Sequence, residues 1–255
     1  MSCCLSVPFK DHFSSHAADY AAYRPGYPPA LFDFLLTLTA GRRLAWDCAT
    51  GNGQAAVDLA ARFERVIATD ASADQIAHAV PHPRVEYRIA AAESSGLPDR
   101  SVDLVTVAQA LHWFDFDRFY AEVRRVLAPD GAIAAWTYNL ARVSPEIDAA
   151  IDRLARDVAG PYWPPERRWV DLEYRTIPFP FPEAAAPAFV HEERWDLERL
   201  LRYLRTWSAV QRYQKATGDD PLAQIRDELA AAWGDSAAAR VVRWPIFLRA
   251  SQPLP

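Results

Sequence analysis

The stretch that decides the fold is Trp46–Ala56, WDCATGNGQAA. Together with the apolar run Leu44–Cys48 it predicts a strand that ends near an aspartate, a tight turn with Gly51 and Gly53, and the start of a helix. Proteins with α/β folds use this arrangement to bring backbone close to an adenosine-containing ligand at the carboxyl edge of a sheet. A turn that only needs small residues is the alternative, because G-x-G pairs are common.

A second acidic residue strengthens the ligand interpretation. Asp70 ends the next predicted strand, 19 residues after Gly51. Dinucleotide-binding folds place an acid about 20 residues after the glycines, where it contacts the ribose hydroxyls. The alternative is that Asp70 only caps the following helix, a position that favours aspartate.

Strands alternate with helices around this segment. A parallel sheet covered by helices on both faces has this pattern, so we expect an α/β fold with a doubly wound, mostly parallel, Rossmann-like sheet. The strands are expected at 44–48, 65–69, 85–89, 102–108, 132–138, near 189–194 and at 241–249. The main helices are expected at 28–39, 56–63, 72–79, 116–127 and 146–158, from residue 196 onward, and at 221–233.

Composition excludes several classes of protein. The chain has 255 residues, a net charge of −5 and 24% charged residues, as an ordinary globular protein does. An acidic chain has no excess of cations to replace the counterions of nucleic acid, so we expect no nucleic-acid partner. No secretory signal or long apolar segment is visible, and the three cysteines are typical of a reducing compartment. We therefore expect a cytoplasmic monomer or homodimer that has no membrane partner and binds no metal.

The spacing of the glycines leaves the identity of the nucleoside open. Gly51, Gly53 and Ala56 also satisfy the dinucleotide fingerprint. Two features disfavour a nicotinamide cofactor. Asp47 would repel a pyrophosphate but attract a cationic amino acid group or sulfonium, and neither lysine has a tyrosine four residues before it. An NAD(P)-dependent oxidoreductase and a non-catalytic nucleoside-binding protein remain the alternatives.

Larger motifs resemble the class I S-adenosylmethionine-dependent methyltransferases, and most closely the branch that contains trans-aconitate methyltransferase-like small-molecule enzymes. The resemblance covers most of the chain. It is carried by WDCATGNGQAA at 46–56, ATDAS at 68–72, AAAESSGLPDRSVDLVTVAQALHWFD at 90–115, EVRRVLAPDGAIAAW at 122–136, YAAYRPGYP at 20–28 and LLRYLRTWSAVQRY at 200–213.

The resemblance implies S-adenosyl-L-methionine as cofactor and a set of residues that bind it. These are Tyr20, Arg24, Asp47, Ala49, Gly51, Asn52, Gly53, Asp70, Ala71, Ala92, Glu93, Gln109 and Ala110. Ala49 stands where the family usually has its first glycine. Alanine is acceptable there if its φ is negative, so we expect a modest adjustment of the loop and not loss of cofactor binding.

The acceptor site is predicted from side chains at the ends of the fourth and fifth strands. His112 and Trp113 follow one strand, and Trp136 and Tyr138 end the other, so all four should face one crevice. His112 is the candidate general base. Trp163 and Arg205 are added from the segments beyond, since arginine can clamp an acceptor carboxylate.

The segment after Asn139 loses the strand–helix rhythm. Residues 160–187 are rich in proline and aromatic residues, as expected of a lid over a site. We therefore expect an N-terminal helical cap (1–40), a cofactor-binding core (41–140), a lid insertion (141–188), and C-terminal helices and closing strands of the same domain (189–255). The predicted activity is methyl transfer from S-adenosylmethionine to an O, N or S atom of a small carboxylic acid or planar heterocycle.

Overall fold

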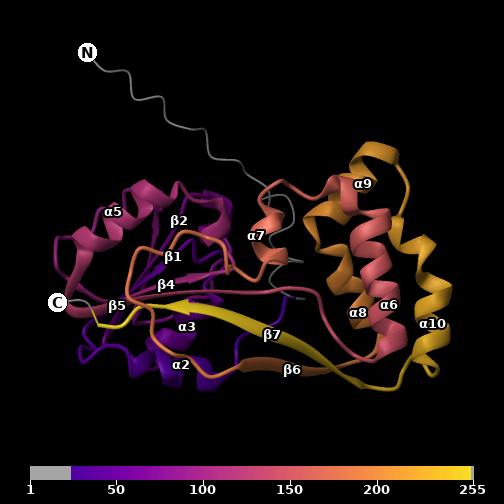
Figure 1. Ribbon diagram of the computed structural model, residues 1–255, viewed down its shortest axis with the longest axis horizontal. Helices are drawn as coiled ribbons and strands as arrows, with labels where there is room; N and C mark the ends of the chain where they lie inside the picture. The colour runs from indigo at the N-terminus through magenta and orange to yellow at the C-terminus, as the bar shows by residue number, and fades with distance from the viewer. Residues whose placement is uncertain (1–23, 254–255) are drawn as a thin grey trace, which may run out of the picture.

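The computed structural model describes residues 24–253, in which a seven-stranded sheet carries helices on both faces and a further helical group at one side (Figure 1). The strand order is β3-β2-β1-β4-β5-β7-β6. The strands are β1 (Leu44–Cys48), β2 (Arg65–Asp70), β3 (Val85–Ile89), β4 (Val102–Ala108), β5 (Leu127–Tyr138), β6 (Phe189–Trp195) and β7 (Arg240–Ala250).

Strands β1 to β5 are parallel, whereas β7 runs antiparallel to both β5 and β6. This confirms the predicted doubly wound, mostly parallel sheet. The α-helices are α2 (Pro29–Leu36), α3 (Gln54–Ala60), α4 (Ala73–Ala77), α5 (Phe116–Val126), α6 (Pro145–Arg153), α7 (Arg167–Asp171), α8 (Leu197–Arg205), α9 (Ser208–Thr217) and α10 (Arg226–Trp233). The shorter turns of helix are η2 (Leu111–Trp113), η3 (Leu154–Val158), η4 (Gly160–Tyr162) and η5 (Pro221–Gln224).

The core lies on both faces of the sheet because neighbouring strand residues point to opposite faces. Ala45 packs with the side chains of α2 and α3, and its neighbour Trp46 packs with those of α5. Both residues are fully buried. Strands covered on both sides read as continuous apolar runs, which is why the sequence pattern located β1 and β4 correctly.

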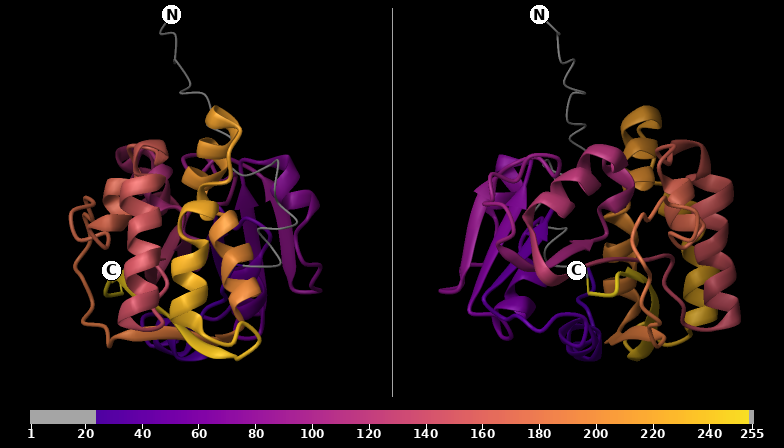
Figure 2. Two further views of the ribbon diagram at one scale, coloured as in Figure 1. Left: turned by 90° about the vertical axis from the view of Figure 1, so that its right-hand side faces the viewer. Right: turned by 60° about the vertical axis from the view of Figure 1, so that its left-hand side comes forward.

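The helices beyond the sheet form one group. Helix α6 packs against α10, and α9 packs against η4, so chain segments on either side of β6 are interleaved. Figure 2 shows this group standing beside the sheet, with β6 and β7 leading into it. Its apolar side chains are continuous with the core under α2 and α3.

Strand β5 begins earlier than predicted. We expected Pro129 and Gly131 to end the preceding helix and the strand to begin at Ala132. Instead α5 ends at Val126, and Leu127 already pairs with Val102. The register then shifts before Leu104 pairs with Ala132, with Asp130 at φ +60° between the two pairings. A bulge of this kind tolerates proline, because the ladder does not need its missing N–H.

Candidate functional site

The strand order reverses between β1 and β4, and the site is built at that point. The two strands are parallel neighbours, and the helices that follow them, α3 and α5, lie on opposite faces of the sheet (Figure 1). The loops after β1 and β4 therefore run toward opposite faces of the sheet. Open α/β sheets bind their ligands at such a switch point, in the crevice outside the carboxyl ends of the strands.

The loop after β1 is wound tightly by left-handed residues. Ala49, Gly51 and Gly53 have φ of +54°, +58° and +89°. At Gly53, a Cβ atom would lie 2.2 Å from the hydroxyl of Tyr87. A side chain is therefore excluded at Gly53 both by the backbone conformation and by the neighbouring tyrosine.

The positive φ of Ala49 does not meet the condition of a negative φ on which alanine was acceptable at this position. An L-residue in the left-handed region costs about 1–2 kcal/mol. The loop keeps the conformation that glycine would adopt without this cost, because the surrounding turn fixes it: the N–H of Thr50 donates to the carbonyl of Thr69, 2.9 Å away.

Asp47 is fully buried beneath this loop. Its carboxylate accepts hydrogen bonds from the hydroxyls of Thr50 (2.5 Å) and Thr106 (2.8 Å). Burial raises its pKa to about 6, and the nearby charge of Asp70 acts in the same direction. The protein thus holds a carboxylate at the crevice at a cost to its own stability.

This cost gives a prediction for Asp47→Asn in the cofactor-free protein. The pKa of Asp47 is about 6 in the folded protein, against 3.8 for an ordinary aspartate. A raised folded pKa means that stability is lost as pH rises from about 4 to 6, by up to about 3 kcal/mol. Asp47→Asn should therefore melt at a higher temperature than the parent above pH 6, and the gap should close below pH 4. A Tm difference that does not change with pH would contradict this origin.

Asp70 joins the two strand ends. One oxygen accepts from the N–H of Gly51 and the other from the N–H of Ser72, each at 2.9 Å. Ser72 also caps α4, as its sequence position suggested, by accepting from Gln75 N. Asp70 is therefore positioned by the glycine loop and fixes it in turn.

Several of the other predicted cofactor residues that the structure describes follow the ends of β1, β2 and β3. Asn52 is buried, and its carbonyl accepts from Val80 N at 3.0 Å. Ala71 is half-buried after β2 and Ala92 is buried after β3. Glu93 accepts from Asp115 N at 3.1 Å, which ties the loop after β3 to the start of α5. Tyr20 lies outside the described residues.

The loop after β4 supplies the opposite wall. Gln109 has φ +59°, and its Oε1 accepts from the Thr137 hydroxyl at 2.9 Å. Its Nε2 is buried and has no hydrogen-bond partner among residues 24–253. A buried amide donor without a partner is costly, so it indicates a ligand that would accept from it. Ala110, beside it, is buried.

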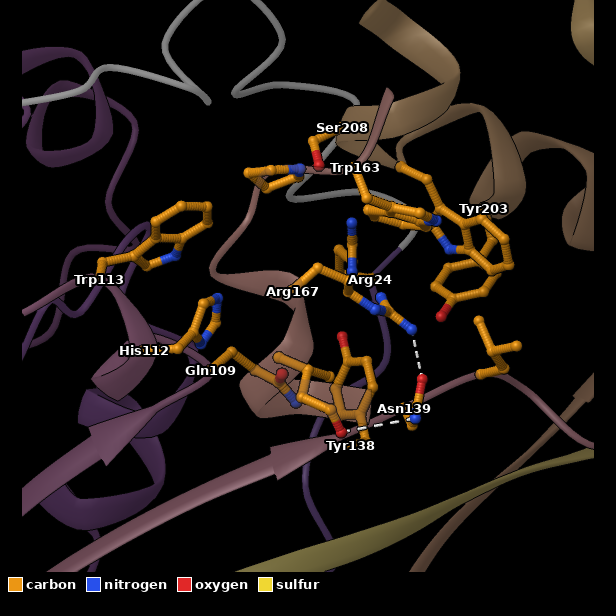
Figure 3. A pocket seen from close by; sticks show the side chains of 14 residues that line it. Arg24, Gln109, His112, Trp113, Tyr138, Asn139, Trp163, Arg167, Tyr203 and Ser208 are labelled. Carbon is orange, nitrogen blue, oxygen red and sulfur yellow. Dashed lines mark hydrogen bonds between the residues drawn. The ribbon is translucent and has the colours of Figure 1, made fainter. Parts of the chain in front are cut away.

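A pocket opens next to Gln109, between the sheet and the helical group. Its lining comes from the ends of β4 and β5, from the 163–170 segment and from the α8–α9 turn, with Arg24 closing it. The lining residues are Arg24, Gln109, His112, Trp113, Tyr138, Asn139, Leu140, Trp163, Pro164, Arg167, Val170, Tyr203, Trp207 and Ser208. Figure 3 shows Arg24 and Arg167 in its middle, with Trp113 and His112 on one side and Trp163 and Tyr203 on the other.

Both arginines of the pocket are held in place. The guanidinium of Arg24 donates to the Thr206 carbonyl at 3.2 Å and lies over the ring of Tyr203. Arg167 donates to Asn139 Oδ1, pairs with Asp171 at 2.8 Å, and lies 4.3 Å from the ring centre of Trp163. Stacked, hydrogen-bonded guanidiniums lose little further freedom when they bind an anion.

His112 is a buried member of the pocket. Its Nδ1 lies 2.7 Å from the hydroxyl of Tyr174. Burial, with a smaller contribution from the charge of Arg167, lowers the pKa of His112 to about 3. The imidazole is therefore neutral at physiological pH, but a base with so low a pKa holds an abstracted proton poorly.

Two predicted acceptor residues lie elsewhere. Trp136 is fully buried in the core and contacts Tyr27 and Phe32 edge-on, so it does not face the crevice. Arg205 does not line the pocket and pairs with Asp220 at 3.4 Å. Trp113, Tyr138 and Trp163 do line the pocket, as expected.

Sequence reasoning missed part of the lining. Asn139 directly follows β5 as Gln109 follows β4, so the strand-end rule could have found it. Tyr203 belongs to the leucine-rich face of α8, where a tyrosine resembles an ordinary core residue. Tyr174, which contacts His112 from outside the pocket, had no sequence signal, because it lies in the proline-rich segment without periodicity.

Within the described part of the chain, none of the helices has the length and apolar character needed to cross a membrane. Residues 24–253 also contain no group of three His, Cys, Asp or Glu side chains that could hold a metal ion.

Comparisons with known proteins agree with this geometry. The family described as "Methyltransferase domain" matches residues 46–135. A candidate methyltransferase of Dictyostelium discoideum is 34% identical over 248 residues, which cover 94% of each chain. The solved structure of a candidate type II methyltransferase from Anaeromyxobacter dehalogenans is 52% identical, covers 91% of this chain and 99% of that one, and has a TM-score of 0.86.

A more distant solved structure, a candidate methyltransferase from an antibiotic biosynthesis pathway of Anabaena variabilis, is 20% identical with a TM-score of 0.52. It covers 84% of this chain and 96% of its own, and supports the fold alone.

Proposed function

The chain belongs to the class I S-adenosylmethionine-dependent methyltransferases, and from this premise we propose that it methylates a small carboxylic acid bound in the pocket beside Gln109. The observation that supports the acceptor class is the pair Arg24 and Arg167 in a pocket otherwise lined largely by aromatic rings. Two guanidiniums offer donors to an anion, and the rings suit a planar body. A planar heterocycle would fit the rings but would not use the charge of the two guanidiniums.

The residues of the crevice fit S-adenosylmethionine by their chemistry. The carboxylate of Asp47 complements the cationic amino acid part, and Asp70 lies at the end of β2 where ribose hydroxyls would be held. Gln109 Nε2 is a buried hydrogen-bond donor to which a ligand atom could bind. We assign Ala49, Asn52, Ala71, Ala92, Glu93 and Ala110 to the walls of the same site, and Arg24 to the boundary between this site and the pocket.

When bound, the cofactor supplies a sulfonium methyl group that is electrophilic without further activation. The protein's task is to hold the acceptor oxygen in line with that methyl and to exclude water, and positioning can supply about 7–11 kcal/mol of the barrier. Arg24 and Arg167 would hold the carboxylate, while Trp113, Trp163 and Tyr138 would flank the planar part. A carboxylate is already deprotonated, so no base is required.

The finer resemblance to the trans-aconitate methyltransferase-like branch is part of this proposal. A planar acid with more than one carboxylate could engage Arg24 and Arg167 together. The 141–188 segment and the C-terminal helices would act as the lid, because Trp163 and Arg167 reach the pocket from the first and Tyr203 and Trp207 from the second. We propose the chain as a monomer or homodimer of the cytoplasm.

A coproduct assay tests the acceptor class. The chain is incubated with S-adenosylmethionine and separate panels of carboxylic acids, phenols and heterocyclic amines, and release of S-adenosylhomocysteine is measured. We expect turnover with planar acids, and little with the matched amides, which have the same shape but no charge. Turnover of amines or phenols alone would contradict the acceptor class.

Cofactor binding without turnover of any panel member would instead favour the non-catalytic nucleoside-binding alternative. An affinity for RNA that falls steeply with salt would favour a nucleic-acid acceptor, which the net charge of −5 disfavours. The oxidoreductase alternative is removed by the family to which the chain belongs.

A further inference from the structure

A buried tyrosine outside the pocket contacts His112 inside it. The hydroxyl of Tyr174 lies 2.7 Å from His112 Nδ1, and the two ring centres are 5.8 Å apart. Tyr174 is fully buried and does not line the pocket, whereas His112 does. Tyr174 can therefore act on an acceptor only through the histidine.

The position of Tyr174 is fixed from several sides. It follows Glu173 just beyond α7, and both residues have left-handed φ, +59° and +57°. Its N–H donates to the Trp169 carbonyl and its own carbonyl accepts from Arg249, each at 2.9 Å. Two non-glycine residues in this region cost about 1–2 kcal/mol each, and such strain persists only where the surroundings determine it.

The hydroxyl of Tyr174 has one proton to give. Burial raises the pKa of Tyr174 well above its usual range, so the phenol stays protonated. Among residues 24–253, His112 Nδ1 is the acceptor found for this proton. A buried hydroxyl that donates to nothing is costly, so the phenol proton is directed to Nδ1 of the neutral imidazole.

The second ring nitrogen of His112 is then the one that carries hydrogen. No hydrogen bond to His112 Nε2 is found among residues 24–253, and Figure 3 shows the ring extending into the pocket toward Arg167. An Nε2–H group there would be a third donor beside the guanidiniums of Arg24 and Arg167. All three groups would favour an acceptor that carries negative charge.

We propose that Tyr174 is a positioning residue that holds His112 in the Nε2–H tautomer, so that His112 donates a hydrogen bond to the methyl acceptor and does not act as its base. The inference rests on the proposed function of the pocket and adds a role for a residue that touches neither the cofactor crevice nor the acceptor. The phenol donates to Nδ1, so the imidazole carries its proton on Nε2, the nitrogen that faces the acceptor.

Kinetics of Tyr174→Phe test this role, with Tyr120→Phe as the matched control. Tyr120 is also buried, belongs to the same core cluster, and donates its hydroxyl to the Pro178 carbonyl at 2.6 Å, away from His112. Loss of the Tyr174 hydroxyl should raise the KM for the acid acceptor roughly 3- to 10-fold and leave S-adenosylhomocysteine affinity unchanged. Tyr120→Phe should change neither. Equal effects of the two variants on KM would overturn the proposal.

A second variant separates positioning from loss of stability. His112→Gln keeps an N–H donor at the end of its side chain, so it should retain more activity than His112→Leu. In the His112→Gln background, adding Tyr174→Phe should have no further effect on KM. Additive effects of the two substitutions would mean that Tyr174 does not act through His112.

Nitrogen NMR of the histidine side chains reads the tautomer directly, without acceptor or turnover. The resonance that disappears in His112→Gln should show a protonated Nε2 and an unprotonated Nδ1, and Tyr174→Phe should mix the two tautomers. A protonated Nδ1 in the parent protein would overturn the proposal. If the tautomer is as expected but acids are not methylated, the proposed function fails and the role of Tyr174 stands.

Discussion

Gly53→Ala should nearly abolish cofactor binding. Alanine would have to adopt φ +89°, and its Cβ would lie 2.2 Å from the Tyr87 hydroxyl. The strained backbone costs about 1–2 kcal/mol, and relief of the overlap costs about 1–3 kcal/mol more. Tyr87 cannot swing away freely, because its hydroxyl donates to the Val80 carbonyl at 2.7 Å. The loop would therefore move out of the conformation that we assign to binding.

Isothermal titration with S-adenosylhomocysteine measures this effect, and we expect affinity to fall roughly 30-fold or more. Gly96→Ala is the matched control, since Gly96 also has positive φ, +68°, but its Cβ would meet nothing within 4 Å. Gly96→Ala should be somewhat less stable than the parent but should bind S-adenosylhomocysteine with the same affinity. If Gly53→Ala bound S-adenosylhomocysteine as the parent does, the glycine loop would not be part of the cofactor site.

Arg167→Met should remove most of the discrimination for charged acceptors. Methionine keeps an apolar stem but removes the guanidinium, which lies over the Trp163 ring in the pocket. Hydrogen bonds to charged groups contribute about 1.5–3 kcal/mol, so kcat/KM for an acid acceptor should fall roughly 10- to 150-fold. Affinity for S-adenosylhomocysteine should stay the same, because the crevice lies on the other side of Gln109.

The helix that follows β6 offers the control. Arg205→Met also removes a half-buried guanidinium, but this one pairs with Asp220 outside the pocket. It should leave kcat/KM near that of the parent. Arg167→Lys keeps the charge but loses the planar fork, so its kcat/KM for the acid acceptor should lie between those of the parent and Arg167→Met. If kcat/KM fell further in Arg205→Met than in Arg167→Met, the acceptor would bind outside the pocket beside Gln109.

The sequence was informative where local rules determine the structure. The buried strand β1, the glycines after it and the acid at the end of β2 are read from period, turn chemistry and spacing over fewer than 30 residues. The family resemblance also gave Arg24 and Gln109, which the structure brings to one pocket. These features lie at strand ends, whose location follows from topology.

The predictions were wrong where the depth of a side chain and the direction in which it packs decide whether it reaches the pocket. Trp136 and Tyr138 project to the same face of β5, but Trp136 lies two residues further from the strand end, about 6.6 Å deeper. There it is covered by Tyr27 and Phe32, and only Tyr138 reaches the pocket. Arg205, at the end of α8, is half-buried and pairs with Asp220, and it does not line the pocket.

Long-range contacts account for what could not be predicted. The hydrogen bond between His112 and Tyr174 joins residues 62 positions apart. The left-handed φ of Ala49 follows from the turn that Thr50 and Thr69 close, a pairing set by the register of β1 and β2. Neither the hydrogen bond nor the φ of Ala49 can be inferred from the type of one residue alone.

A crystal structure with S-adenosylhomocysteine bound is the most direct test of the site. We predict the ribose at Asp70, the adenine beside Ala92 and Glu93, and the sulfur facing the pocket that holds Arg167 and His112. That arrangement would place the acceptor within reach of the methyl group. Density for the nucleoside away from the ends of β1 and β4, or with its sulfur turned from the pocket, would contradict the account.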